Sequence, residues 1–368
     1  MIDQIAKRFS TDGQFISASP FGTGHINDTT IAEFDQSGMT VRYILRKINS
    51  DVFPRPEILV RNTVAALTHV KERLISDAVA DRQRRVMEMI SANEDSPYVI
   101  DERGDYWCCF RFIENAMSLE VVDKPEHAFE AAAAYGLFQR YLSELDVRDF
   151  EPVIENFHNI VSRFKVFGKA VRADRHKRAG KASKEIDTIM RATPIVDAYD
   201  SLMKRREIPM RVTHNDTKLN NVLLDAETGK GLCVTDLDTV MPGTVLYDFG
   251  DMVRSFTSPA DEDETDLSCV SLRKDVFEAL TRGYLRHLND ILTPAEKTHF
   301  VFGARMMTLI MAIRFLTDYL DGDVYYKTAR PGHNLDRCRN QLELLRHIER
   351  SADELQRIVD AVCKTNEV

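Results

Sequence analysis

The most informative part of the chain reads Thr213-His214-Asn215-Asp216-Thr217-Lys218-Leu219-Asn220-Asn221. Asp216 precedes the amide Asn221 by five residues, and the acidic pair Asp236-Leu237-Asp238 begins fifteen residues later. Kinase-type phosphoryl transfer needs one carboxylate to orient the acceptor hydroxyl, and an amide and a second carboxylate to hold magnesium. The spacing therefore predicts a base at Asp216 and magnesium ligands at Asn221 and Asp236. The alternative is an Asp that only forms a turn.

The residues around this stretch predict a strand, a loop and a hairpin. Residues 210–213 suit a short strand, and residues 214–220 are polar, as in a loop. Residues 221–224 and 232–235 suit two strands joined by a turn at 225–229. Pairing these strands brings Asn221 and Asp236 side by side, and Asp216 projects from the loop toward them. We expect His214 and Asp238 to support this arrangement.

A literal Asp-Phe-Gly triplet occurs at 248–250, but its distance from the loop disfavours a metal role. Asp248 lies thirty-two residues after Asp216, whereas Asp236 lies twenty after it. We therefore predict that Asp248 is structural and accepts hydrogen bonds that hold the loop.

The predicted secondary structure changes from mainly strands to mainly helices near residue 114. Residues 1–110 favour strands at 40–48 and at a hairpin over 98–110, with one helix from Glu57. Most later segments favour helices, beginning with 126–145, where Pro125 suits a first turn. The prediction is an α+β fold of two lobes, with a β-rich lobe at 1–114 and a larger, mainly helical lobe at 115–368. Ligands often bind between such lobes.

A glycine-rich turn near the N-terminus is a candidate phosphate site. Gly22-Thr23-Gly24 allows close approach of backbone N–H groups to phosphates, although an ordinary hairpin turn also fits. A cation on the strand that follows, Arg46 or Lys47, could pair with the phosphates. The G-x-x-x-x-G-K-[ST] pattern of P-loop enzymes is absent from the sequence.

The net charge, the cysteine spacing and the length of the apolar runs limit the kinds of partner and cell compartment that we expect. The net charge of −9 argues against nucleic acid held by phosphate contacts. The six scattered cysteines contain no C-x-x-C pair, which suits reduced thiols in a cytoplasmic protein. The N-terminus lacks an apolar signal region, and the apolar run 306–316 is too short to span a membrane. We expect a cytoplasmic monomer or weak dimer without a membrane partner.

Three charged features remain open. The basic segment 163–184 and the acidic segment 261–264 favour solvated helices over binding sites. Arg314 is a lone charge in an apolar helix, where an unpaired charge is costly. It could form an ion pair with Asp318, four residues on, or contact a substrate.

The motifs together resemble the aminoglycoside phosphotransferase superfamily, whose fold is protein-kinase-like. The resemblance covers nearly the whole chain, through residues 21–29, 43–49, 211–225, 236–251 and 314–325. It implies ATP and Mg²⁺ as cofactors, a hinge for adenine at Phe112, Ile113 and Glu114, and a small-molecule acceptor. The segments His25-Ile26-Asn27 and Arg314-Phe315-Leu316 are similar to those of members that phosphorylate the anomeric hydroxyl of an N-acetylhexosamine.

That similarity implies acceptor contacts at His25, Asn27, Arg314 and Tyr325. The chain departs from related kinases in one respect: the helix from Glu57 offers no obvious acid to pair with the phosphate-binding cation. Kinases for aminoglycosides, choline or homoserine, and an inactive nucleotide-binding module, are the alternatives. Asp216, Asn221 and Asp236 are all present, which argues against the inactive module.

Overall fold

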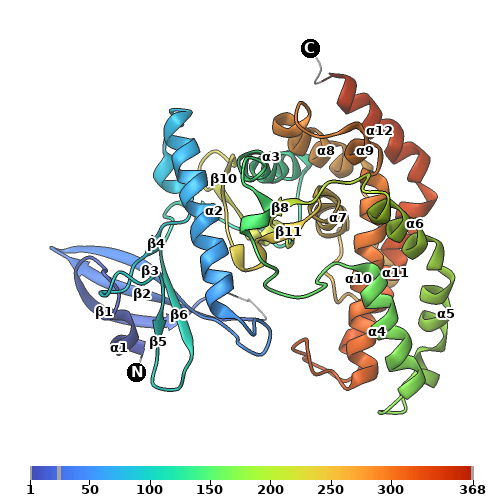
Figure 1. Cartoon of the computed structure of the whole chain (residues 1–368), viewed down its shortest axis with the longest axis horizontal. Helices are drawn as coiled ribbons and strands as arrows, with labels where there is room; N and C mark the ends of the chain where they lie inside the picture. Colours follow the sequence, from blue (N-terminus) through green and yellow to red (C-terminus); the bar gives the residue numbers. More distant parts are fainter. Residues whose placement is uncertain (1, 23–25, 366–368) are drawn as a thin grey trace.

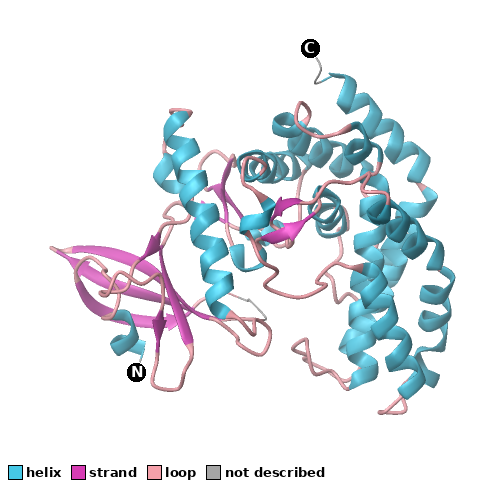
Figure 2. Cartoon of the chain, in the orientation of Figure 1, coloured by secondary structure: helices cyan, strands magenta, loops and turns pink. Residues whose placement is uncertain are grey.

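The computed structural model describes residues 2–22 and 26–365, and it confirms the predicted α+β class. Figure 1 shows a sheet-rich region built from the N-terminal part of the chain beside a larger helical region, with helix α2 (Pro56–Ser76) between them. Figure 2 shows that strands dominate the first region and helices the second.

The N-terminal sheet is antiparallel, with the order β1-β2-β3-β6-β4, and β5 also pairs with β6. Its strands are β1 (Gln14–Pro20), β2 (Asp28–Gln36), β3 (Met39–Lys47), β4 (Met89–Ile90), β5 (Val99–Ile100) and β6 (Tyr106–Arg111). The predicted strand at 40–48 and the hairpin over 98–110 are therefore confirmed. Helix α1 (Ile2–Ala6) covers a small core that includes Phe34, Tyr43 and Leu45.

Helix α2 links the two regions. Pro56 occupies its first turn, where a missing backbone N–H has no cost. The buried side chain of Asn62 donates hydrogen bonds from Nδ2 to the carbonyl oxygens of Glu151 (2.8 Å) and Val240 (3.0 Å). These bonds fix α2 against the region that carries the loop at 213–221.

Residues 112–115 connect β6 to β7 (Ala116–Met117), which pairs with β9 (Val222–Asp225). Strand β9 pairs in turn with β10 (Gly231–Val234), so the predicted hairpin is confirmed. Strand β8 (Arg211–Thr213) is also present, but it pairs with β11 (Met241–Gly243), a strand that the sequence did not predict.

The C-terminal region is built from ten helices within the described residues. They are α3 (Pro125–Leu142), α4 (Ile160–Ala173), α5 (Ser183–Arg191), α6 (Thr193–Lys204), α7 (Val245–Phe256), α8 (Lys274–Leu288), α9 (Pro294–Thr298), α10 (Phe300–Asp321), α11 (His333–Arg350) and α12 (Ala352–Thr365). Helices α7 and α10 cross closely, because a Cβ on Gly250 would lie 2.4 Å from the carbonyl oxygen of Gly303. The rings of Phe249 and Phe300 stack at 4.1 Å across the same crossing.

Helix α10 is long and apolar enough, by length and composition alone, to cross a membrane. However, 78% of its most apolar segment is buried inside the protein, and core helices meet the same two criteria. Its burial between α4, α7 and α11 accounts for its composition.

The acidic segment 261–264 differs from the prediction, because it forms a turn and not the start of a helix. Glu262 pairs with Arg254, and Asp263 pairs with Arg330 and is in hydrogen-bond contact with the His333 ring. Side chains from outside the segment therefore fix this stretch, which local composition could not predict.

Candidate active site

A cavity of about 250 Å³ lies between the two regions. Its lining includes eight of the eighteen predicted site residues: Asn27, Arg46, Asp216, Asn221, Asp236, Asp238, Arg314 and Tyr325. His214 and Asp248 lie behind the lining, among the buried residues. Thr23, Gly24 and His25 lie outside the described residues.

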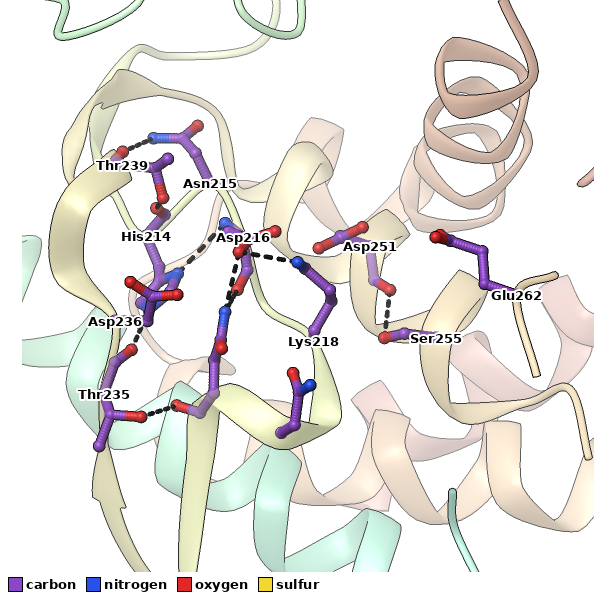
Figure 3. A network of polar contacts seen from close by, with 12 residues as sticks. His214, Asn215, Asp216, Lys218, Thr235, Asp236, Thr239, Asp251, Ser255 and Glu262 are labelled. Atoms are coloured by element: carbon purple, nitrogen blue, oxygen red, sulfur yellow. Dashed lines mark hydrogen bonds and ion pairs between the residues drawn. The ribbon is translucent and has the colours of Figure 1, made fainter. Parts of the chain in front are cut away.

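Asp216 sits at the base of the cavity with two donors on one oxygen. Asn221 Nδ2 donates to Asp216 Oδ2 (2.9 Å) and to the Asp216 carbonyl oxygen (2.9 Å). Lys218 Nζ lies 3.2 Å from the same Oδ2, and Figure 3 shows its side chain between Asp216 and Asp251. Within the described chain, Oδ1 of Asp216 has no hydrogen-bond donor, so it is available to an acceptor hydroxyl.

The loop owes its shape to Asp248, from the Asp-Phe-Gly triplet. Its carboxylate accepts hydrogen bonds from the backbone N–H groups of His214 (3.1 Å) and Asn215 (2.8 Å). Its carbonyl oxygen accepts a bond from the Thr217 hydroxyl (2.6 Å). Burial raises the pKa of Asp248 to about 7, although the two N–H groups oppose that shift. Asp248 therefore holds the loop and does not line the cavity.

His214 connects the loop to the hairpin as a neutral ring. The Asp216 N–H donates to His214 Nδ1 (3.2 Å), so the ring proton must lie on Nε2. Nε2 then donates to the Thr235 carbonyl oxygen (2.9 Å). Burial lowers the pKa of His214, which keeps this tautomer uncharged. His214 thereby fixes Asp216 relative to the segment that follows β10 and carries Asp236 (Figure 3).

Arg46 joins the sheet to the hairpin end. Its Nη1 lies 2.8 Å from Asp236 Oδ1 and 2.9 Å from Asp238 Oδ1, and Asn27 Nδ2 donates to the other oxygen of Asp238. The partners of Arg46 are thus two carboxylates of the C-terminal region and not an acid of α2. Burial, followed by the charge of Asp236, raises the pKa of Asp238 to about 6, although Arg46 opposes this. For Asp236, burial is outweighed by Arg46 and Lys218, and its pKa is lowered.

The structure separates the two candidate cations on β3. Successive side chains of a strand point to opposite faces, and Arg46 faces the cavity. Lys47 lies on the other face, 3.5 Å from both Asp28 and Asp105. It therefore does not line the cavity, and the prediction that Lys47 could be the phosphate-binding cation gains no support.

Asn221 and Asp236 fit a magnesium site by their chemistry. Mg²⁺ prefers hard oxygen ligands and is usually held by one or two carboxylates together with phosphates. An amide oxygen and a carboxylate from adjoining ends of β9 and β10 supply that set. In the described residues there is no cluster of three or more His, Cys, Asp or Glu for a metal held by protein alone.

The predicted adenine hinge lies where β6 leaves the sheet. The Phe112 N–H donates to the carbonyl oxygen of Arg42 (3.0 Å), and the Arg42 guanidinium lies over the Phe112 ring at 4.2 Å while pairing with Glu114. Phe21 meets Phe112 edge to face at 5.8 Å, beside Gly22. The hinge residues, Ile113 included, lie outside the lining of the cavity.

One end of the cavity is lined mainly by aromatic side chains. We call it the aromatic end; it comprises Phe157, Arg314, Phe315, Tyr325 and Tyr326. The Arg314 guanidinium lies 4.7 Å from the ring of Phe157, 5.6 Å from that of Tyr325 and 5.5 Å from that of Tyr326.

Asp318 does not pair with Arg314, so the predicted alternative of an ion pair between them is wrong. Both oxygens of the buried Asp318 carboxylate are used by other donors: the N–H groups of Val324 (2.9 Å), Tyr325 (2.8 Å) and Tyr326 (3.0 Å), and Asn334 Nδ2 (2.8 Å). Asp318 thus fixes the loop that carries two of the rings, and Arg314 stays directed at the cavity.

A match to a known protein family agrees with this geometry. The sequence model of the phosphotransferase enzyme family matches residues 17–287, which is more than half of the chain. The chain belongs to this family. It is therefore a small-molecule phosphotransferase with an alcohol group as acceptor.

Solved structures show the same fold at low sequence identity. The phosphotransferase resembles an aminoglycoside phosphotransferase from Alicyclobacillus acidocaldarius, with 13% identity, a TM-score of 0.58, and coverage of 99% of this chain and 96% of that one. It also resembles choline kinase from Cryptosporidium parvum, with 11% identity, a TM-score of 0.56 and 96% coverage of both chains. At these identities the likeness concerns the fold alone.

Sequence reasoning missed several residues of the phosphotransferase cavity. The lining also includes Lys218, Asp251, Arg254, Glu262, Phe157, His158, Tyr326, Lys327 and Arg337. Lys218 stands within the loop motif, two residues after Asp216, so its position was a usable signal. Phe157 and His158 come from an irregular segment between α3 and α4, and no local pattern marked them.

Proposed function

We propose that this phosphotransferase is an ATP-dependent kinase for the anomeric hydroxyl of an N-acetylhexosamine, such as N-acetylglucosamine or N-acetylgalactosamine. The observation that carries the proposal is the aromatic end, where a half-buried guanidinium is surrounded by three rings. Rings pack against the apolar faces of a sugar, and a guanidinium donates hydrogen bonds to its hydroxyl or amide oxygens.

The charges that line the cavity disfavour the cationic acceptors, choline and aminoglycosides. A cationic acceptor needs carboxylates whose charge is not already offset by a cation of the protein. Here Arg254 offsets the charge of Asp251 and Glu262, and Lys218 offsets that of Asp216. The cations Arg314, Lys327 and Arg337 also line the cavity, so a quaternary ammonium would meet like charge.

The residues suggest a direct, in-line transfer in which Asp216 handles the proton. Its Oδ1 would accept a hydrogen bond from the acceptor hydroxyl and then take the proton as the oxygen attacks the γ-phosphorus of ATP. The bond from that phosphorus to the β–γ bridging oxygen would break, and ADP would leave. Asn221 and Lys218 hold Oδ2, and so fix the direction of the carboxylate. Arg46 is placed to contact phosphate oxygens from the sheet side of the cavity.

Asn221 and Asp236 would hold magnesium, which neutralises charge on the transferring phosphoryl group when it is bound. Arg46 now occupies an oxygen of Asp236, so it would have to share or release that oxygen when a metal–nucleotide complex enters. We further propose that ATP binds mainly to residues 1–114 and the sugar to residues 115–368, as the predicted lobes imply.

A panel of acceptors with labelled ATP tests the proposal. The panel contains N-acetylglucosamine, N-acetylgalactosamine, glucose, choline, homoserine and kanamycin, and phosphorus NMR identifies the product. The expected result is an N-acetylhexosamine 1-phosphate. Transfer only to choline, homoserine or kanamycin would reject the proposal, and transfer to none of the acceptors would favour an inactive nucleotide-binding module.

A further inference from the structure

Three cations of the cavity lining lack a carboxylate partner in the part of the chain that the structure describes: Arg314, Lys327 and Arg337. Their contacts are with neutral groups. Arg314 reaches Met311 Sδ and the Tyr325 hydroxyl, both at 3.5 Å. Arg337 Nη1 reaches the Lys327 carbonyl oxygen (3.3 Å) and Asn334 Oδ1 (3.2 Å).

Arg337 is the most unusual of the three, because it is only 7% exposed. Its Nε is buried and has no hydrogen-bond partner among the described residues, and its guanidinium lies 5.6 Å from the Phe315 ring. A buried charge without a counter-ion costs several kcal/mol, on the order of the free energy of a buried ion pair that loses one member. Arg254, the other buried arginine of the lining, has two carboxylate partners.

In the described residues no acid lies within ion-pair distance of Arg314, Lys327 or Arg337, and three acids of the lining pair with other cations. Asp216 binds Lys218, and Asp251 and Glu262 bind Arg254. Both carboxylate oxygens of Asp318 accept hydrogen bonds from backbone N–H groups or from the amide of Asn334.

A fourth cation makes the imbalance larger. Arg163 donates to the Phe157 carbonyl oxygen (3.0 Å) behind the aromatic end. Burial, together with the positive charge of Arg314, lowers the pKa of Arg163 to about 10. Arg163 does not itself line the cavity, but its charge adds to the positive potential near Arg314 and so favours an anion there.

The cations are arranged around two rings that pack at a tilt. The Tyr326 ring, 5.5 Å from Arg314, packs at 4.8 Å on the Phe315 ring, which lies beneath Arg337. Lys327 follows Tyr326 directly and is exposed at the rim. Positive groups therefore border both sides of the surface on which a sugar ring would rest.

We infer that the natural acceptor is an N-acetylhexosamine that carries an anionic substituent, a carboxylate or a phosphate, which Arg337 and Lys327 receive. This inference rests on the proposed function and narrows its substrate class. The buried and positioned guanidinium of Arg337 binds an anion more strongly than the same group in water, and the exposed ammonium of Lys327 adds a second positive charge at the rim. Arg314 remains available to the hydroxyl or amide groups of the sugar.

The test compares four acceptors by kcat/KM. They are N-acetylglucosamine, its C6 carboxylic acid, its C3 lactic acid ether and its 6-phosphate. At least one anionic sugar is expected to exceed N-acetylglucosamine by about ten-fold or more, the ratio that about 1.4 kcal/mol gives. Whether carboxylate or phosphate wins identifies the substituent.

Two variants tie that preference to the cations. Arg337→Met and Lys327→Met are each expected to lower the anionic-to-neutral ratio by about three-fold or more. Arg346→Met is the control, since Arg346 lies on the same helix but pairs with Glu343 away from the cavity, and it should leave the ratio unchanged. Lys327 is exposed, so its variant keeps the test valid even if Arg337→Met does not fold.

The outcomes separate the two proposals. Phosphorylation of N-acetylglucosamine with no anionic sugar preferred overturns this inference and leaves the proposed function intact. A preference that survives both variants also overturns the assignment to Arg337 and Lys327. If none of the four sugars is phosphorylated, the proposed function itself is rejected, and this inference with it.

Discussion

Replacing Arg46 by methionine tests the charge arrangement at the hairpin end. The variant keeps an unbranched aliphatic side chain but removes the guanidinium that Asp236 and Asp238 share. Removing one member of a buried ion pair costs about 3–5 kcal/mol. Asp238 is 9% exposed and Arg46 15%, but Asp236 is 38% exposed and partly screened by water. We therefore expect a loss of about 3 kcal/mol in the free energy of unfolding at pH 8.

The destabilisation caused by Arg46→Met should be smaller at low pH than at high pH. The folded pKa of Asp238 is raised to about 6, above its unfolded value, so its contribution to stability is lost as the pH rises through 6. Without Arg46 the folded pKa rises further, at about 1.4 kcal/mol for each unit. At pH 5 Asp238 is neutral in both proteins, and the cost should fall to about 1 kcal/mol.

Urea unfolding at pH 5, 6, 7 and 8, followed by circular dichroism, measures this difference. Lys47→Met is the matched control, because Lys47 neighbours Arg46 on the same strand but has half-exposed partners at 3.5 Å. It should cost less than about 1 kcal/mol at every pH. Equal costs of Arg46→Met at pH 5 and pH 8 would refute the reasoning.

Three further predictions concern catalysis and the acceptor. Asp216→Asn should lower kcat by about 10²–10⁴-fold while calorimetry shows ATP binding unchanged, and a kcat near that of the native protein would remove Asp216 from the mechanism. Asp236→Asn should raise the magnesium concentration for half-maximal velocity by about ten-fold or more, and an unaltered magnesium dependence would exclude Asp236 as a ligand. Asp318→Asn should raise the KM of the acceptor by about ten-fold but leave the KM of ATP unchanged, because the amide cannot accept all three backbone N–H bonds that hold Tyr325 and its neighbours. An acceptor KM that does not move would show that the loop holds its shape without Asp318.

Local patterns predicted the parts of the site that are close in sequence. The hairpin over 221–235 follows from two β-rich runs around a turn, and it alone brings the ends of β9 and β10 together. The spacing of the Asp-Phe-Gly triplet predicted a structural role for Asp248. The structure shows that its carboxylate accepts hydrogen bonds from the N–H groups of the loop. The positive φ of Asn215 (64°), which turns the loop back toward Asp248, was not foreseen.

Contacts between distant segments decided the rest. Whether Arg46 or Lys47 faces the cavity depends on which face of the sheet packs against the C-terminal region, and strand alternation alone does not reveal that. The pairing of Arg254 with Glu262, and the use of Asp318 by a loop instead of by Arg314, arise from tertiary packing.

Short-range spacing and periodicity are enough to predict the α+β class and the order of the acids and the amide that are proposed to carry phosphoryl transfer. Which charges are paired depends instead on tertiary packing. Arg46 meets Asp236 across 190 positions of the chain, and Arg337 meets no acid in the described residues. The reason is physical: ion pairing depends on distance and burial in the folded protein, and neither is set by neighbours along the chain.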